Sequence, residues 1–157
     1  MTRRYARAPR GERAEGSVPQ DHYARLTMLG ALRLEGVVAL ATVPAATDTD
    51  VFSTFVNHSL VPALRQGDVV LWDRLQPHKA PAVREAIESA GAKLLLLPPY
   101  SPDFSPIEPC WSKVKQHLRG VEARTPEALG QAAQEAFASV SDHDIHGWFE
   151  HCGLCAH

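Results

Sequence analysis

Three features of the sequence predict an α/β fold with a mixed sheet. Residues 26–33 and 36–43 are short apolar runs separated by two residues, which indicates an antiparallel strand pair. Two strand candidates, the apolar run at residues 69–72 and the segment at residues 93–97, flank a helical pattern, and a crossover of this kind pairs its strands in parallel. Three more helical segments follow. We therefore expect one sheet with parallel and antiparallel pairs and flanking helices.

Two helices are predicted between the strands. Asp48 can cap the first helix, and Pro62 should kink or end it. The second helix, at about residues 79–90, should end at Gly91, since glycine tolerates the left-handed conformation common at helix C-termini. The apolar positions of the first helix recur at helical spacing and are Phe52, Phe55, Val56, Leu60 and Leu64.

Each of the last three helices has a recognisable start signal. Ser105 and Glu108 have the spacing of a capping box, in which each side chain bonds the other residue's backbone amide. The Thr125-Pro126 pair favours a second helix start, and Ser141 with Asp144 favours a third. The stripe of the first of these helices is Ile107, Trp111, Val114 and Leu118.

Length and composition indicate one globular domain. The chain has 157 residues, of which 45% are hydrophobic and 22% charged, so a packed core is expected. The net charge of −2 argues against an autonomous nucleic-acid binder, so any DNA contact should be local. No apolar run reaches the roughly 18 residues of a membrane helix, and no signal-peptide core follows the start. A cytoplasmic protein without membrane contact is expected, and three cysteines fit a reducing compartment.

Positive charge is concentrated at the start of the chain. Residues 1–13 contain five arginines and one glutamate. Residues 1–22 are predicted to form an irregular basic arm, and residues 23–157 the folded domain. The arm has two interpretations, a solvated terminus or a segment that contacts DNA phosphates, for which the candidates are Arg3, Arg4 and Arg7.

Two carboxylates are candidate metal ligands. Asp73 follows an apolar strand, and ligands bind beyond the carboxyl ends of strands in open α/β sheets. Glu108 lies in the first turn of the helix after the next strand, so both side chains could converge on one edge. Carboxylates of this kind hold Mg²⁺. The structural alternatives are a capping role for Glu108 and a loop hydrogen bond for Asp73.

A specific motif surrounds the second carboxylate. It consists of Leu-Pro-Pro-Tyr-Ser-Pro-Asp at residues 97–103, Pro-Ile-Glu at residues 106–108, and Trp111. It resembles the signature of the DDE transposases, specifically the mariner-like superfamily and its bacterial insertion-sequence branch. The resemblance implies a ribonuclease H-like fold, with Asp73 and Glu108 as the second and third catalytic acids. It also implies roles for His78 and Lys79, which follow Asp73 as in the family and are predicted to contact nucleic acid.

The resemblance implies a reaction and its partners. The family cleaves transposon-end DNA and joins it to target DNA by metal-dependent phosphoryl transfer, so Mg²⁺ or Mn²⁺ is the expected cofactor. Basic residues along the Glu108 helix could meet phosphates or could form an ordinary solvated face. They are Lys113, Lys115 and Arg119.

The sequence also departs from the family pattern. The strand that carries the first catalytic acid is absent, and Arg74 and Ser105 stand where the family usually has Asn. We therefore expect a partial catalytic domain that is inactive alone. The alternative is a non-catalytic remnant or regulator that forms oligomers with itself or with full-length transposase. A lesser alternative is a metal or redox site in the C-x-x-C of Cys152 and Cys155.

Overall fold

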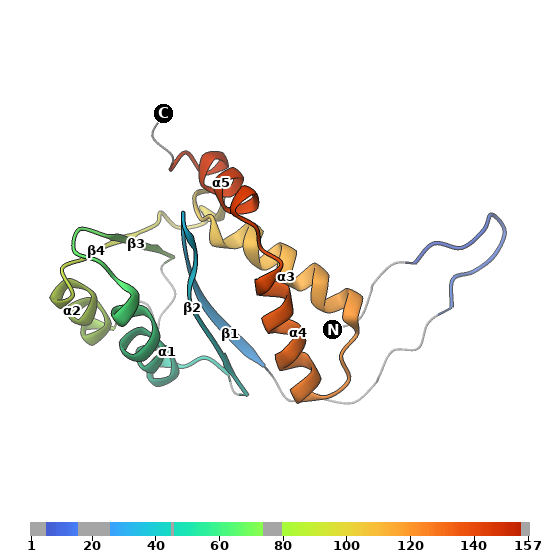
Figure 1. The fold of residues 1–157 in the computed structure, drawn as a ribbon, viewed down its shortest axis with the longest axis horizontal. Coiled ribbons are helices and arrows are strands. Elements are labelled where there is room, and N and C mark those ends of the chain that lie inside the picture. Colours follow the sequence, from blue (N-terminus) through green and yellow to red (C-terminus); the bar gives the residue numbers. More distant parts are fainter. Residues whose placement is uncertain (1–5, 16–25, 45, 74–79, 155–157) are drawn as a thin grey trace.

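The structure is a computed structural model that describes residues 6–15, 26–44, 46–73 and 80–154 (Figure 1). Residues 6–15 form no helix or strand, and the extent of the basic arm, residues 1–22, remains a prediction. None of the helices in the described ranges is both long and apolar enough to cross a membrane.

The predicted antiparallel strand pair is confirmed. Strands β1 (Thr27–Arg33) and β2 (Gly36–Val43) pair from Thr27 with Val43 to Arg33 with Gly36. The register shifts once, because Ala31 pairs with Ala39 whereas Leu32 pairs with Val37. The extra residue on β2 is a bulge, and a bulge changes which face the following side chains occupy.

Helix α1 (Thr49–Phe55) begins and ends as its sequence indicates. The Asp48 side chain accepts a hydrogen bond from the Val51 amide at 2.8 Å, which confirms it as the N-cap. The helix continues as a π turn, η1 (Val56–Leu60), and a 3₁₀ turn, η2 (Val61–Ala63). Pro62 lacks an amide hydrogen and lies in the last of these turns, after which the chain becomes extended.

The predicted parallel crossover is also confirmed. Strands β3 (Val69–Trp72) and β4 (Lys93–Leu96) pair in parallel on either side of helix α2 (Pro81–Ser89). Gly91 has a φ of +79°, as expected of the residue that ends the helix. Its carbonyl accepts a hydrogen bond from the Gly67 amide at 2.9 Å, which joins the approach to β3 to the approach to β4.

Three helices complete the chain: α3 (Ile107–Val121), α4 (Pro126–Ala138) and α5 (Asp142–His151). Thr125 caps α4 through a bond from the Ala128 amide at 3.1 Å. Ser141 and Asp144 form the capping box of α5, so both predicted starts are confirmed. Helices α3 and α4 pack against each other and against one face of the hairpin (Figure 1).

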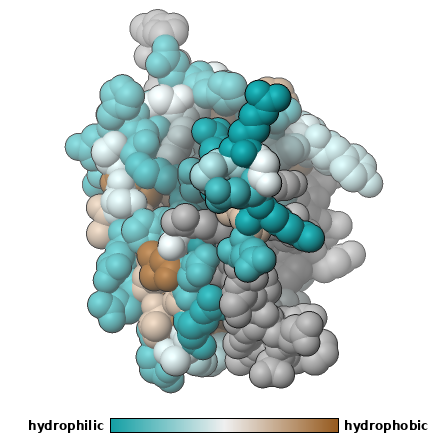
Figure 2. Space-filling model, turned by 90° about the vertical axis from the view of Figure 1, so that its right-hand side faces the viewer, coloured by the Kyte–Doolittle hydropathy of each residue, from teal (hydrophilic) through white to brown (hydrophobic). Residues whose placement is uncertain are grey.

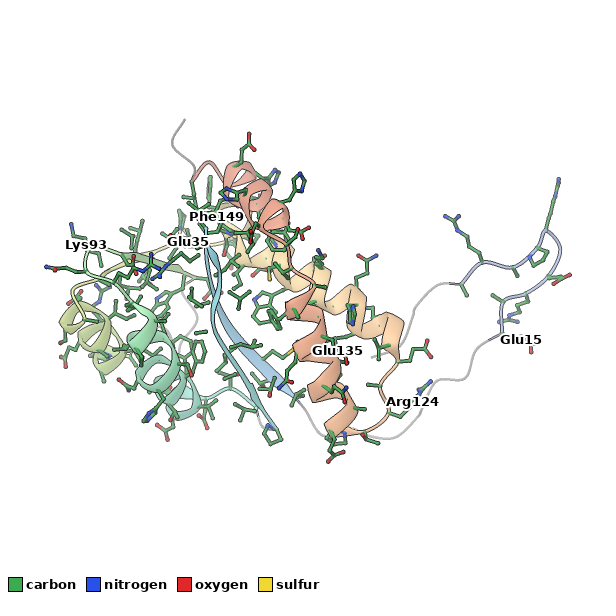
Figure 3. All side chains as sticks on the ribbon, in the orientation of Figure 1. Glu15, Glu35, Lys93, Arg124, Glu135 and Phe149 are labelled. Atoms are coloured by element: carbon green, nitrogen blue, oxygen red, sulfur yellow. The ribbon has the colours of Figure 1, made fainter. Side chains whose placement is uncertain are left out.

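The β1–β2 hairpin is covered on both faces, and it separates two core clusters. On one face its side chains join the cluster of α1, η1 and α2, and on the other the cluster of α3 and α4. Figure 3 shows side chains on both sides of the hairpin, between it and the helices. The faces alternate along β1, with Leu29 and Ala31 on the first and Met28 and Leu32 on the second.

The expected single sheet is not what the described residues form. They contain two separate two-stranded sheets, β1–β2 and β3–β4, with no pairing between them. The mixed α/β content and both pairings were therefore predicted correctly, whereas one continuous sheet was not. A cleft lies between β1 and β3.

Candidate active site

The cleft between the two sheets has a volume of about 1050 Å³. It is lined by every residue from 28 to 33 of β1 and by every residue from 68 to 73, which include β3. Successive strand residues point to opposite faces, so a lining of consecutive residues means that the edges of β1 and β3 border the cleft. Both edges are left unpaired within the described sheets.

Asp73 lies at this cleft because it directly follows β3. The Trp72 carbonyl accepts a hydrogen bond from the Leu97 amide at 2.8 Å, so the parallel pairing extends to the residue before Asp73. Leu97 is buried, and it begins the proline-rich segment that leads to α3. Asp73 itself is exposed at the end of the strand.

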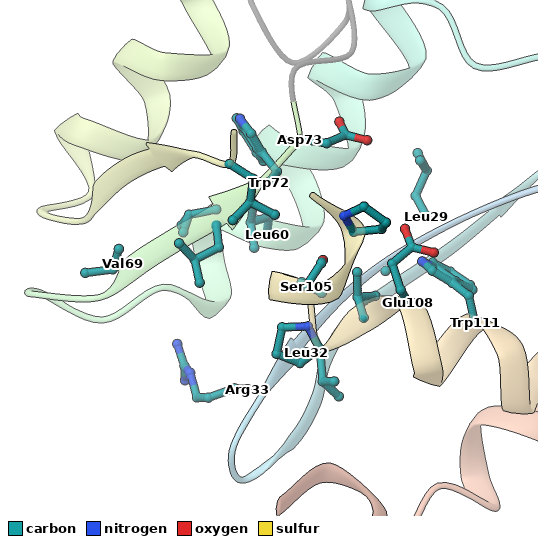
Figure 4. Close-up of a pocket in the computed structure, with 18 of the residues that line it drawn as sticks. Leu29, Leu32, Arg33, Leu60, Val69, Trp72, Asp73, Ser105, Glu108 and Trp111 are labelled. Carbon is teal, nitrogen blue, oxygen red and sulfur yellow. The ribbon is translucent and has the colours of Figure 1, made fainter. Parts of the chain in front are cut away.

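Glu108 enters the same cleft from the first turn of α3. Figure 4 shows its carboxylate directed toward the side of the cleft on which Asp73 lies. Glu108 is exposed, and its side chain accepts no hydrogen bond from any described residue.

The capping-box alternative for Glu108 is wrong. Helix α3 has Pro106 as its N-cap, with φ −59° and ψ −19°, and no side chain caps it. Ser105 contributes only its carbonyl, which accepts a bond from the Glu108 amide at 3.0 Å. The Ser105 amide donates its hydrogen bond to the Pro102 carbonyl at 2.9 Å, so it is not bound by the Glu108 carboxylate as a capping box requires. The Glu108 carboxylate is thus not engaged in closing the helix.

A third acid at the cleft, Asp68, is held in contacts with two arginines. Asp68 lies at the opposite end of β3 from Asp73, and it forms an ion pair with Arg33. Its carboxylate also accepts a hydrogen bond from the Arg65 amide at 2.8 Å. In the described ranges, no group of three or more His, Cys, Asp or Glu side chains is arranged to hold a metal ion. Asp73 and Glu108 are the other two carboxylates that line the cleft.

Two carboxylates suit a hard divalent cation but do not enclose it. Mg²⁺ is commonly bound through one or two carboxylates and keeps water or phosphate oxygens as its other ligands. Asp73 and Glu108 have this donor chemistry, and both are exposed enough to leave room for such ligands. The pair fits an open site that shares its metal with a phosphodiester.

Trp111, predicted as a stripe residue and as part of the motif, fixes the start of α3 against the hairpin and α4. Its indole packs on Gly30 of β1, where a Cβ atom would lie 3.4 Å from Cη2. Its ring also meets Phe137 of α4 edge-on, with centroids 5.4 Å apart. Trp111 is one turn from Glu108 and lines the same cleft. Glycine at position 30 leaves the space that the Trp111 indole occupies, and it is the feature of the sequence that could have indicated this contact.

The basic residues of α3 do not form one set. Lys115 and Arg119 are exposed and follow Glu108 at 7 and 11 residues, which places them on its helix face. Lys113 lies on another face and is ion-paired with Asp144 of α5. Figure 2 shows a mostly hydrophilic surface on the side of the molecule that it presents. Contact of these three residues with DNA remains a prediction.

Several predicted contacts lie outside the described residues. They are Arg3, Arg4, His78 and Lys79, together with Arg74 and Cys155. Arg7 is described and exposed. The metal or redox role of Cys152 and Cys155 therefore also remains a prediction, although Cys152 is buried and burial raises the pKa of its thiol.

The fold and the cleft are those of a mixed α/β domain with two carboxylates at neighbouring strand and helix ends. A family model described as DDE superfamily endonuclease matches residues 1–129, a range that includes Asp73 and Glu108. The chain belongs to this family of DNA nucleases, whose members generally use divalent metal ions. A search of curated proteins finds no match.

Proposed function

We propose that this chain is part of the catalytic domain of a DDE transposase of the mariner-like superfamily, in its bacterial insertion-sequence branch. The proposed reaction is metal-dependent cleavage of transposon-end DNA followed by strand transfer. The observation that carries the proposal is the entry of Asp73 and Glu108 into one cleft from the end of β3 and the start of α3. The motif at residues 97–108 supports the branch.

The chain's own residues would perform two tasks in this reaction. Asp73 and Glu108 would bind Mg²⁺ or Mn²⁺ through carboxylate oxygens. Lys115 and Arg119, on the same face of α3, would contact phosphates further along the DNA. When bound, the metal ion would activate the attacking water or hydroxyl and stabilise the charge on the phosphate.

We further propose that the chain alone does not cleave DNA. Two-metal sites need more ligands than two carboxylates, and Asp68 is held by Arg33. A third carboxylate would come from a segment outside the described residues or from another chain. The alternative function is that of a non-catalytic regulator that joins full-length transposase or a second copy. In the described sheets β1 and β3 are edge strands, which favours this alternative, because edge strands can pair with a strand of another chain.

Metal binding tests the site separately from activity. Mn²⁺ affinity can be measured from the electron paramagnetic resonance signal of the free ion. Asp73→Asn and Glu108→Gln should each weaken binding at least about tenfold, since even outer-shell changes reach that size. Glu85→Gln, on the exposed side of α2, is the matched control and should bind as the wild type does. Equal affinity in all four proteins would remove the metal site.

Cleavage assays then separate the two proposed functions. Purified chain with Mg²⁺ or Mn²⁺ should leave labelled transposon-end DNA intact. Cleavage that disappears in Asp73→Ala would contradict the proposed inactivity and establish a nuclease. Co-purification with intact transposase, without cleavage by the chain, would favour the regulator.

A further inference from the structure

The segment between β4 and α3 presents an aromatic side chain at the edge of the cleft. Its first residue, Leu97, is 7% exposed, and its last, Pro106, is also buried. Between them lie Pro98, Pro99 and Pro102, whose rings restrict the backbone. The segment is therefore anchored at both ends and stiff between them.

Tyr100 is at the turn of this segment and has an unusual conformation. Its φ is +57°, in the left-handed region that residues other than glycine rarely adopt. The hydroxyl of Ser101 donates a hydrogen bond to the Pro99 carbonyl at 3.3 Å, which closes the backbone around Tyr100. Strained residues of this kind persist when the surrounding structure fixes them, and they concentrate at binding sites.

No internal packing accounts for the Tyr100 ring. The residue is 102% exposed, so it buries no apolar surface against the protein. It nevertheless lines the cleft that Asp73 and Glu108 enter. A rigid aromatic ring that is fully exposed beside a pair of carboxylates is available to a ligand and has no role in the core.

We propose that Tyr100 stacks on an unpaired nucleobase of DNA bound at the cleft. This inference rests on the proposed function, because it takes DNA as the ligand. In the proposed reaction the metal ion at Asp73 and Glu108 would take the phosphodiester, so a contact beside it is left for another part of the nucleotide. Base stacking on an aromatic ring is such a contact and accepts any base. The stiff segment reduces the conformational entropy lost when the ring is fixed by a ligand.

Phe104 provides a matched control. It belongs to η4 (Pro102–Phe104) in the same segment, and it is 54% exposed. It does not line the cleft, whereas Tyr100 does. A contact that depends on any exposed aromatic residue would involve both positions, and a contact at the cleft would involve Tyr100 alone.

Photocrosslinking and binding test the proposal. The probe is a short duplex with a single-stranded overhang that contains 5-iododeoxyuridine, and Ca²⁺ replaces Mg²⁺ to prevent cleavage. Long-wave ultraviolet light should join the overhang to residue 100, as identified by mass spectrometry of the digested adduct. Tyr100→Ala should lose this adduct and weaken binding roughly 5- to 150-fold, the range that corresponds to one stacked base. Tyr100→Phe and Phe104→Ala should keep both.

Each other result contradicts the proposal in a different way. If the wild type and Tyr100→Ala bind the overhang equally, and no adduct forms at residue 100, the stacking role is wrong while DNA binding stands. If Phe104→Ala weakens binding as much as Tyr100→Ala, the contact does not belong to the cleft. If the wild type binds no DNA, both the stacking role and the proposed function fail.

Discussion

Asp144 joins the start of α5 to α3, and its removal should destabilise the protein measurably. Its carboxylate accepts hydrogen bonds from the Ser141 amide at 2.8 Å and the Ser141 hydroxyl at 2.6 Å. It also forms an ion pair with Lys113, with side chains 35% and 26% exposed. Asp144→Ala loses a capping interaction of about 1 kcal/mol and a partly exposed ion pair of about 0.5 kcal/mol. We expect a loss of roughly 1.5 kcal/mol in the free energy of unfolding.

The pH dependence follows from the same contacts. Hydrogen bonds from Lys113 and Ser141 hold the pKa of Asp144 well below its usual range. A carboxyl group whose pKa is lower in the folded state stabilises the protein above its unfolded pKa of about 3.9. That stabilisation disappears as the pH falls through the folded pKa. The difference between wild type and Asp144→Ala should therefore be constant near pH 7 and begin to shrink below roughly pH 4.

Urea unfolding followed by circular dichroism measures both effects. The transition of Asp144→Ala should move to lower urea with an unchanged slope, since the buried surface stays the same. Glu150→Ala, an exposed position on the same helix, is the control and should unfold as the wild type does. A loss below about 0.5 kcal/mol at pH 7, within the range of ordinary surface substitutions, would refute the reasoning. So would a difference that does not shrink in acid.

Three further predictions concern the cleft and the core. Gly30→Val should place methyl groups against Trp111, because a Cβ atom at this position would lie 3.4 Å from its ring. Urea unfolding should show a loss of about 1–3 kcal/mol in the free energy of unfolding, and Mn²⁺ binding should weaken as well. Tyr100→Gly should relieve the strain of the left-handed backbone at this position, about 1–2 kcal/mol, partly offset by the conformational freedom of glycine in the unfolded chain. The melting temperature of Tyr100→Gly should therefore exceed that of Tyr100→Ala. A lower value would contradict the strain. Burial raises the pKa of the Cys110 thiol to about 11. In a Cys155→Ser background, a disulfide reagent at pH 8 should therefore modify Cys110 at least about a hundredfold more slowly in the folded protein than in the unfolded protein. Equal rates would show that the thiol is accessible.

Local patterns predicted the elements well, and one pair of similar motifs shows where such patterns fail. Ser141 and Asp144 have the same spacing as Ser105 and Glu108, yet only the first pair forms a capping box. The difference lies in the amide of the serine. The Ser141 amide donates a hydrogen bond to the Asp144 carboxylate at 2.8 Å, whereas the Ser105 amide donates to the Pro102 carbonyl of the preceding turn at 2.9 Å. The failed capping box is therefore what leaves Glu108 available for metal.

The cleft could not be predicted from local patterns. The runs at residues 26–33 and 69–72 predicted strands because strand periodicity is a local property. Whether β1 and β3 pair with each other depends on contacts between residues far apart in the sequence, and no local pattern encodes them. The same applies to Arg33, which neutralises Asp68 from 35 positions away. The left-handed conformation of Tyr100 also escaped prediction, since tyrosine gives no sign of it.

Asp73 and Glu108 are carried by elements that pack in different core clusters, so the packing between the clusters sets the separation of the two carboxylates. Asp73 follows β3, whose Val70 and Trp72 pack in the cluster of α1 and α2. Glu108 is carried by α3, whose Cys110, Val114 and Leu118 form the other cluster. The clusters meet through the β1–β2 hairpin, which contributes side chains to both. The separation of the carboxylates is thus set by residues that never touch a metal ion, and Gly30 on the hairpin is the most direct of them. Substitutions there should change metal affinity without altering either ligand.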